Sequence, residues 1–258
     1  MRYLPDSIRP LNLAHRGACA VAPENTVRAF LRAIELGADG VELDVQLSAD
    51  GAVVVCHNYE VDKTSNGHGR IADLTLAQLK ALDFGGWFGP EFKDERIPTL
   101  DEVFDSLGAQ VLVNIELKTE SLRSHGLETA VAGIIARRRV HDRVIVSSFN
   151  PVALWRLRRL DPQIEIGLLY APNLPIFLAR AWLRPWVRPQ ALHPEHTLVD
   201  AEYVSWARRH GYAVNAWTVN DETTMRRLTD LHVTSVITDY PDRLAAMRSS
   251  KIAHPERS

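Results

Sequence analysis

Two carboxylates in the segment 40–46, Glu42 and Asp44, alternate with valine and leucine residues. This period of two predicts a strand that carries both acids on one face and its apolar side chains on the other. Two like charges at this spacing repel each other, and burying them without a partner costs free energy. A cation between them would offset that cost. The alternative is an edge strand that turns ordinary surface acids to solvent.

A third carboxylate and a lysine lie at the end of a second predicted strand, 110–118, which is apolar until Glu116 and Lys118. Their spacing of two residues places both side chains on one face, either as a structural ion pair or pointing into a shared site. Together with Glu42 and Asp44, this acid would form a site of hard oxygen ligands. Such a site suits Mg²⁺ or Ca²⁺ better than zinc.

Two histidines follow short predicted strands: His15 follows 11–14, and His57 follows 52–56. A histidine at a strand end is more often structural than catalytic, but His15 is followed by Arg16 and a glycine. Arginine matches the geometry of a phosphate, and glycine lets the backbone approach a ligand. Zinc would compete for the acidic site if either histidine were a ligand. Otherwise one ring can take a proton and the other can give one.

Strand and helix patterns alternate along the rest of the chain, about eight times in 258 residues. The predicted strands are 11–14, 40–46 with its extension 52–56, 110–118, 144–148, 164–170, 191–193, 213–218 and 235–238. The predicted helices are 26–36 with Asn25 as its N-cap, 75–82, 100–107, 126–139, 151–160, 174–183, 199–210, 222–231 and 242–249. This order predicts one α/β domain over 1–258, a (β/α)8 TIM barrel with a small inserted lobe, 58–98, after the second strand. A doubly wound sheet is the alternative, but its glycine-rich loop is missing after the first strand.

In a TIM barrel, function gathers at the carboxyl ends of the strands. Further polar and aromatic residues end the later strands of this chain, and we expect several of them to contact substrate. The candidates for substrate contact at these ends are Phe149, His193 and Trp217, and Asp239 ends the last strand.

Composition excludes several classes of protein. A formal net charge of -2 does not provide the basic surface of a nucleic-acid binder. Two cysteines, Cys19 and Cys56, have no metal-type spacing and predict free thiols in a cytoplasmic protein. We see no signal peptide, and the longest apolar stretch, 174–187, is interrupted by proline and arginine, so it cannot span a bilayer. The sequence does not specify an oligomeric state.

Short motifs spread over almost the whole chain resemble those of the glycerophosphodiester phosphodiesterases. Each is weak alone, but their order and spacing together are specific. The matching motifs are His15-Arg16-Gly17, Pro23-Glu24-Asn25-Thr26, Glu42-Leu43-Asp44-Val45, His57, Ile97-Pro98-Thr99-Leu100, Ile115-Glu116-Leu117-Lys118, Trp217-Thr218-Val219-Asn220 and Thr238-Asp239.

The resemblance implies a TIM barrel that hydrolyses a small-molecule glycerophosphodiester to sn-glycerol 3-phosphate and an alcohol, with a divalent cation, Mg²⁺ or Ca²⁺. It implies that His15 and His57 are the catalytic histidines and that Glu42, Asp44 and Glu116 bind the metal. It also implies that Arg16 and Lys118 lie near the phosphate and that Trp217 forms an aromatic wall. The chain departs from the family where Asn58 follows the second histidine, a position often occupied by aspartate. A phospholipase C-like lyase that stops at a cyclic phosphate is an alternative on the same fold.

The stretch 173–189 combines Phe177, Trp182 and Trp186 with three arginines. We favour a core-facing helix with exposed arginines. The alternative is an apolar rim that holds an acyl chain or makes a weak contact with a membrane surface. In that case the substrate would be a lysophospholipid and the activity that of a lysophospholipase D.

Overall fold

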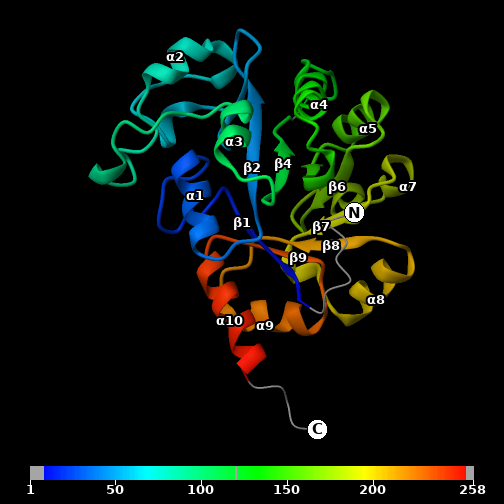
Figure 1. The fold of residues 1–258 in the computed structure, drawn as a ribbon. Coiled ribbons are helices and arrows are strands. Elements are labelled where there is room, and N and C mark those ends of the chain that lie inside the picture. The colour runs from blue at the N-terminus through cyan, green and yellow to red at the C-terminus, as the bar shows by residue number, and fades with distance from the viewer. Residues whose placement is uncertain (1–8, 120, 254–258) are drawn as a thin grey trace.

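The computed structural model describes residues 9–119 and 121–253. Within these ranges, eight parallel strands form one closed sheet: β1 (Leu11–Ala14), β2 (Gly40–Leu47), β4 (Leu112–Leu117), β5 (Val144–Ser148), β6 (Glu165–Tyr170), β7 (Ala191–Pro194), β8 (Ala213–Ala216) and β9 (Ser235–Thr238). β1 pairs in parallel with both β2 and β9, which closes the ring (Figure 1). The predicted TIM barrel is therefore confirmed, and an open doubly wound sheet is excluded.

Helices surround the barrel on its outer side (Figure 1). They are α1 (Val27–Glu35), α3 (Leu100–Ser106), α4 (Leu127–Arg138), α5 (Pro151–Leu160), α6 (Ile176–Ala179), α7 (Arg184–Val187), α8 (Ala201–Arg209), α9 (Glu222–Asp230) and α10 (Pro241–Ala253). Most of the longer ones begin at a side-chain cap, such as the reciprocal bonds between Thr99 and Glu102 at the start of α3. These caps fix where each helix starts relative to the strand before it.

The outward-facing side chains of the strands form the main core. On β2, Val41, Leu43 and Val45 are fully buried and belong to the same cluster as Phe30 of α1. Each buried side chain of this kind contributes roughly 1.5–3 kcal/mol relative to an exposed one. Because the apolar residues of β2 are fixed against the helices, its polar residues must face into the barrel.

The segment after the second strand forms the inserted lobe. A short strand, β3 (Val53–Val55), runs antiparallel to β2 and leads into it. The lobe contains η1 (Val61–Lys63), η2 (Ile71–Asp73), α2 (Leu76–Ala81) and η3 (Pro90–Phe92), and Figure 1 shows it beside β2, apart from the ring of helices. Its apolar side chains, including Ile71 and Leu79, form a small cluster of their own. Two further 3-10 turns, η4 (His141–Arg143) and η5 (His196–Leu198), lie in later connections.

Two local predictions were wrong. Thr26, and not Asn25, caps α1, because the Thr26 hydroxyl accepts a hydrogen bond from Ala29 N. The single core-facing helix favoured for 173–189 is instead the pair of four-residue helices α6 and α7, and α6 buries none of its residues. The side chains of Phe177, Trp182 and Trp186 are 44–58% exposed, so the large aromatic residues of this stretch face solvent, while Ala181 and Val187 join the main core.

Cys19 and Cys56 are free thiols, as predicted. Across the described residues, no helix combines the length and the apolar character needed to cross a bilayer.

Candidate active site

Three carboxylates converge at one end of the barrel. Strand pairing places Asp44 of β2 directly opposite Glu116 of β4. Glu42 lies two residues before Asp44, so it shares the same inward face. Oxygen atoms of these three side chains all lie within 4.8 Å of one another. Glu42 is 4% exposed and Asp44 is 1% exposed, so the alternative of an edge strand with surface acids is wrong.

Two cations approach these carboxylates. Lys118 Nζ donates to Glu116 Oε1 at 3.1 Å and lies 3.7 Å from Asp44 Oδ1. Arg16 donates its backbone N–H to Glu42 Oε2 at 3.0 Å, and its Nε lies 3.5 Å from Asp44 Oδ2. Two positive side chains therefore face three carboxylates, so the cluster has a negative balance when all three acids are ionised.

The cost of this crowding is visible in the pKa values of the acids. Burial, together with repulsion from Asp44, raises the pKa of Glu42 to about 8 and that of Glu116 to about 6. Burial also acts to raise the pKa of Asp44, but the charges of Lys118 and Arg16 outweigh it and hold that pKa below its ordinary value. Asp44 is therefore the acid whose charge the surrounding protein stabilises most.

These residues fit a bound divalent cation. The donors are hard carboxylate oxygens from neighbouring strands, converging on one point, which is the ligand set that Mg²⁺ and Ca²⁺ prefer. A divalent cation among them would also offset the mutual repulsion that raises the pKa values of Glu42 and Glu116. Glu42, Asp44 and Glu116 therefore form the candidate metal site.

His15 is held from the last strand of the barrel. Its backbone N–H donates to Thr238 O at 2.8 Å, which brings its side chain beside Asp239. His15 Nδ1 donates to Asp239 Oδ1 at 2.7 Å, and Asn220 in turn donates to Asp239 Oδ2 at 2.6 Å. Burial alone lowers the pKa of His15, but the bond to Asp239 and the charge of Glu42 outweigh it and raise that pKa. The bond through Nδ1 leaves Nε2 as the nitrogen that can serve a substrate.

His57 is held differently. Gln46 on β2 donates through Nε2 to the carbonyl oxygens of Cys56 and Asn58, both at 2.8 Å, which clamps the backbone around the histidine. His57 Nδ1 donates to Asn58 Oδ1 at 3.2 Å, so an uncharged amide stands where a carboxylate stands beside His15. Burial lowers the pKa of His57, and the positive charges of Arg16 and Lys118 add to this effect while Asp44 opposes it.

The cavity at this end of the barrel, here called the acidic cavity, has a volume of about 110 Å³. Eight of the residues that the sequence predicts for the site line this cavity: His15, Arg16, Glu42, His57, Glu116, Lys118, Phe149 and Trp217. Asp44 does not line the cavity itself, but it forms ion pairs with Arg16 and Lys118, which do. The rings of Phe149 and Trp217 meet edge to face at 5.4 Å and form an aromatic side of the cavity.

One predicted site residue does not reach this wall. His193 on β7 is completely buried in the barrel interior, where its Nε2 lies 2.9 Å from Asn215 Nδ2. Its contribution to the cavity is indirect, because its carbonyl oxygen accepts the indole N–H of Trp217 at 2.7 Å. The backbone of His193 thus helps to position Trp217, whereas its side chain is buried beside Asn215 and does not line the cavity.

Sequence reasoning missed several residues that position the site. Glu24 accepts two bonds from Arg16 Nη1, and Asn25 donates to Asp44 Oδ2 at 2.9 Å. Both Arg16 (φ 54) and Asn25 (φ 59) have left-handed backbone, a conformation that costs free energy and recurs at functional sites. The signal available was the motif that contains Glu24 and Asn25, but a motif does not show its partners. Gly17 approaches α1, where a Cβ would lie 2.7 Å from a backbone atom of Ala29, and not a ligand.

The fold and the site together define a class. A closed barrel that gathers acids, cations and two oriented imidazoles at the carboxyl ends of its strands suits hydrolysis of a phosphate ester. A sequence profile of the glycerophosphoryl diester phosphodiesterase family matches residues 15–243. The chain belongs to this family, and the predicted enzyme class, a phosphodiesterase of glycerophosphodiesters, is confirmed.

Individual relatives support the same family. The chain is 41% identical to a glycerophosphodiester phosphodiesterase of Caldanaerobacter subterraneus over 92% of this chain and 97% of the relative. It is 33% identical to a glycerophosphodiester phosphodiesterase of Bacillus subtilis, over 92% of this chain and 85% of the relative. Among solved structures, a phosphodiesterase of Oleispira antarctica in complex with the product sn-glycerol-3-phosphate has a TM-score of 0.83 and 33% identity, with 93% of this chain and 97% of that chain covered.

Proposed function

We propose that the chain hydrolyses glycerophosphodiesters to sn-glycerol 3-phosphate and an alcohol, with a divalent cation held by Glu42, Asp44 and Glu116. The observation that carries this proposal is the convergence of three carboxylates, Glu42 and Asp44 buried and Glu116 partly buried, at a cavity that two histidines also line. The product bound in the Oleispira neighbour, sn-glycerol-3-phosphate, supports the choice of product. When bound, the cation, Mg²⁺ or Ca²⁺, would polarise a non-bridging oxygen of the phosphate.

The two cations of the site would hold the phosphate. Arg16 and Lys118 both line the acidic cavity, and their side chains are only 19% and 13% exposed. At this degree of burial, water screens their charges weakly, so they would offset the charge that develops on the phosphoryl oxygens. Phe149 and Trp217 would form the apolar side of the cavity, against which the carbons of glycerol can pack.

The two histidines would divide the proton transfers. Their environments move their pKa values in opposite directions, which is the pattern expected of an acid and a base that act together. His15, whose pKa is raised, would be protonated and would donate its Nε2 proton to the leaving alcohol. His57, whose pKa is lowered, would be neutral and would accept a proton from the attacking group at its Nε2.

Two attacking groups fit this assignment. Either the free hydroxyl next to the phosphodiester on glycerol attacks phosphorus, or a water molecule does so directly. In the first route a cyclic phosphate forms, and water then opens it while the two histidines exchange roles. A lyase of the phospholipase C type would release that cyclic phosphate as its final product.

Glycerophosphocholine followed by phosphorus NMR tests the proposal. We expect sn-glycerol 3-phosphate and choline in equal amounts, loss of turnover in EDTA, and recovery with Mg²⁺ or Ca²⁺. A cyclic phosphate that persists would make the chain a lyase. Full turnover in EDTA would refute the role of the three carboxylates as metal ligands.

A further inference from the structure

A second and larger cavity, here called the apolar pocket, adjoins the acidic cavity. Its volume is about 680 Å³, within the roughly 300–1,000 Å³ typical of small-molecule sites. The two cavities share Glu116, Lys118 and Phe149 in their walls. A molecule whose phosphate lies in the acidic cavity can therefore extend into the apolar pocket without leaving the protein.

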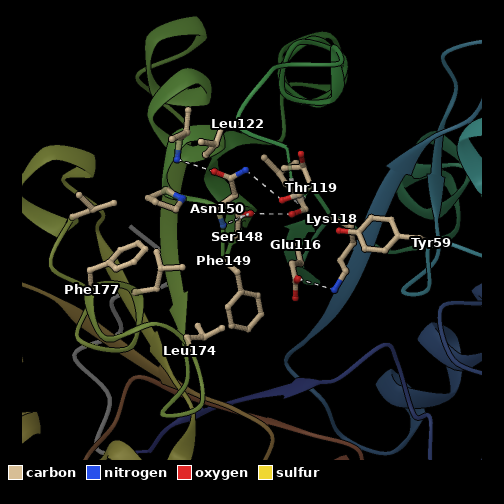
Figure 2. A pocket seen from close by; sticks show the side chains of 15 residues that line it. Tyr59, Glu116, Lys118, Thr119, Leu122, Ser148, Phe149, Asn150, Leu174 and Phe177 are labelled. Atoms are coloured by element: carbon tan, nitrogen blue, oxygen red, sulfur yellow. Dashed lines mark hydrogen bonds and ion pairs between the residues drawn. The ribbon is translucent and has the colours of Figure 1, made fainter.

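The far wall of the apolar pocket consists of aliphatic and aromatic side chains. Leu174, Phe177 and Leu178 contribute from the α6 region, and Leu122 contributes from the connection before α4 (Figure 2). Phe177 is 46% exposed and Leu122 is 69% exposed. Large apolar side chains left open around a hollow are typical of a binding site, because leaving them in water costs free energy.

Two polar side chains in the wall of the apolar pocket, Ser148 and Asn150, are bonded to the backbone. Ser148 Oγ donates to Leu117 O at 2.9 Å, and Asn150 Nδ2 donates to Thr119 O at 3.3 Å (Figure 2). Asn150 Oδ1 accepts the backbone N–H of Val152 at 3.0 Å, where it caps α5. These groups hold the wall in shape and present little hydrogen bonding to a ligand, so this part of the pocket suits a hydrocarbon.

Polarity therefore changes along the pocket. Glu116 and Lys118 lie at the end shared with the acidic cavity, and Phe177 lies toward the opposite side (Figure 2). A ligand that matches both ends has a charged phosphate head and one apolar chain. We infer that the apolar pocket binds a single acyl chain carried by the glycerol of the substrate. The protein would then cleave lysophospholipids as well as glycerophosphodiesters.

This inference rests on the proposed function and adds one substituent to its substrate. The phosphorus–oxygen bond to the headgroup alcohol breaks, and the oxygen of water becomes bonded to phosphorus. One proton of that water passes to the departing alcohol and the other remains in solution. The products are a monoacylglycerol 3-phosphate and the headgroup alcohol.

Choline release measures both substrates with one assay. Wild-type protein is given glycerophosphocholine and a series of lysophosphatidylcholines with chains of four to eight carbons, each below its critical micelle concentration. Because every substrate is then a dissolved monomer, adsorption to a lipid surface cannot contribute. We expect kcat/KM to rise with each added methylene by up to about fourfold, the value of burying one such group.

The variants Phe177→Ser and Leu122→Ser, alone and combined, test whether the pocket carries this gain. Both side chains are exposed, so their replacement does not open a cavity in the core. In the double variant we expect the rise with chain length to flatten, with kcat/KM for the eight-carbon substrate reduced at least about tenfold. Turnover of glycerophosphocholine should be unchanged.

Matched controls are available on the same surface. Ile176 is the neighbour of Phe177 on α6 and is 60% exposed, and Leu160 at the end of α5 is 51% exposed. Neither belongs to the wall of the apolar pocket. Ile176→Ser and Leu160→Ser should keep the wild-type dependence on chain length.

The possible outcomes separate the two proposals. If wild-type protein releases choline from glycerophosphocholine and shows no gain with chain length, the acyl-chain site is refuted and the proposed function stands. If it releases choline from neither kind of substrate, the proposed function itself fails. If Ile176→Ser and Phe177→Ser lose equal activity on the eight-carbon substrate, the acyl chain binds on the outer surface of α6. That result would also overturn the assignment of the acyl chain to the apolar pocket.

Discussion

The acidic cavity and the apolar pocket lie side by side but are built from different kinds of structure. The acidic cavity uses side chains on β2 and β4, where a continuous ladder fixes each residue; Asp44 and Glu116 are direct partners in it. The apolar pocket takes its far wall from the connection that holds α6, which has four residues and buries none of them. One region is rigid and charged, and the other is irregular and apolar.

This difference separates chemistry from substrate choice. Catalytic groups need fixed positions, and barrel strands provide them, whereas connecting segments tolerate change and can alter what binds. Substitutions in the acidic cavity should therefore abolish turnover of every substrate. Substitutions in the apolar pocket should change only the preference among substrates.

The largest effect is expected from removing either histidine. His57→Ala and His15→Ala should each lower kcat for glycerophosphocholine by at least about a hundredfold, since each removes one acid–base contribution. His141→Ala is the matched control, because His141 also bonds to a carboxylate, Asp161 at 2.7 Å, but lies outside the acidic cavity. Stopped or continuous assays of choline release give the comparison. Near-normal turnover in His57→Ala would remove that residue from the chemistry.

A smaller but direct effect is expected on cation binding. Glu42→Gln keeps the shape of the side chain and can still accept the backbone N–H of Arg16, but it removes one negative charge from the site. In wild-type protein, a cation at a hundred times its dissociation constant should add about 2.7 kcal/mol to the free energy of unfolding. We expect most of that gain to disappear in Glu42→Gln, as measured by thermal unfolding with EDTA, Mg²⁺ or Ca²⁺.

The control for this measurement is Asp73→Asn, which removes an exposed carboxylate in η2 of the inserted lobe. It should keep the full gain in melting temperature with either cation. An equal gain in Glu42→Gln and wild-type protein would show that the cation binds elsewhere.

The same contrast explains what the sequence could predict. The alternation on β2 and the positions of Glu116 and Lys118 follow from the period of a strand, so the barrel and most of the acidic cavity could be predicted. The pairing of His15 with Asp239 could not, because the two residues are joined only by the closure of the ring, 224 positions apart. His193 shows the opposite error, since a strand-end position does not distinguish a wall residue from a fully buried one.

Short irregular segments were harder to predict from the sequence than the strands of the barrel. Apolar composition in 173–189 favours a core helix, but this stretch forms two four-residue helices, and Phe177 and Trp182 are exposed. At this length, tertiary context outweighs propensity and pattern. Asn25 was misread because asparagine favours helix N-caps, whereas its left-handed backbone instead lets it donate to Asp44. The sequence offers an apolar rim at 173–189 as an alternative to the core helix, but its union with Glu116, Lys118 and Phe149 in one pocket is seen only in the structure.

A shift in pH dependence is expected from Asp239→Asn. Burial lowers the pKa of His15, and the bond to Asp239 together with the charge of Glu42 raises it above the ordinary value. Without the carboxylate at 239, the pKa of His15 should fall. If His15 acts while protonated, kcat/KM declines above its pKa, so the alkaline limb should move to lower pH.

The matched variant is Asp161→Asn, which removes the carboxylate that bonds to His141. Its profile of kcat/KM against pH should coincide with that of wild-type protein. Movement of the acidic limb in Asp239→Asn, in place of the alkaline limb, would reverse the assignment and make His15 the base.

The smallest effect, and the finest test of the division between the histidines, comes from Asn58→Asp. The change places a carboxylate 3.2 Å from His57 Nδ1, where the amide oxygen of Asn58 now accepts a bond. A negative charge there favours the protonated ring, so the pKa of His57 should rise. If His57 acts while neutral, kcat/KM declines below its pKa, and the acidic limb should move to higher pH while the alkaline limb stays in place. A shift of the alkaline limb alone would contradict the role of His57 as the base, and an unchanged profile would show that the ring at position 57 does not titrate in the rate-determining step.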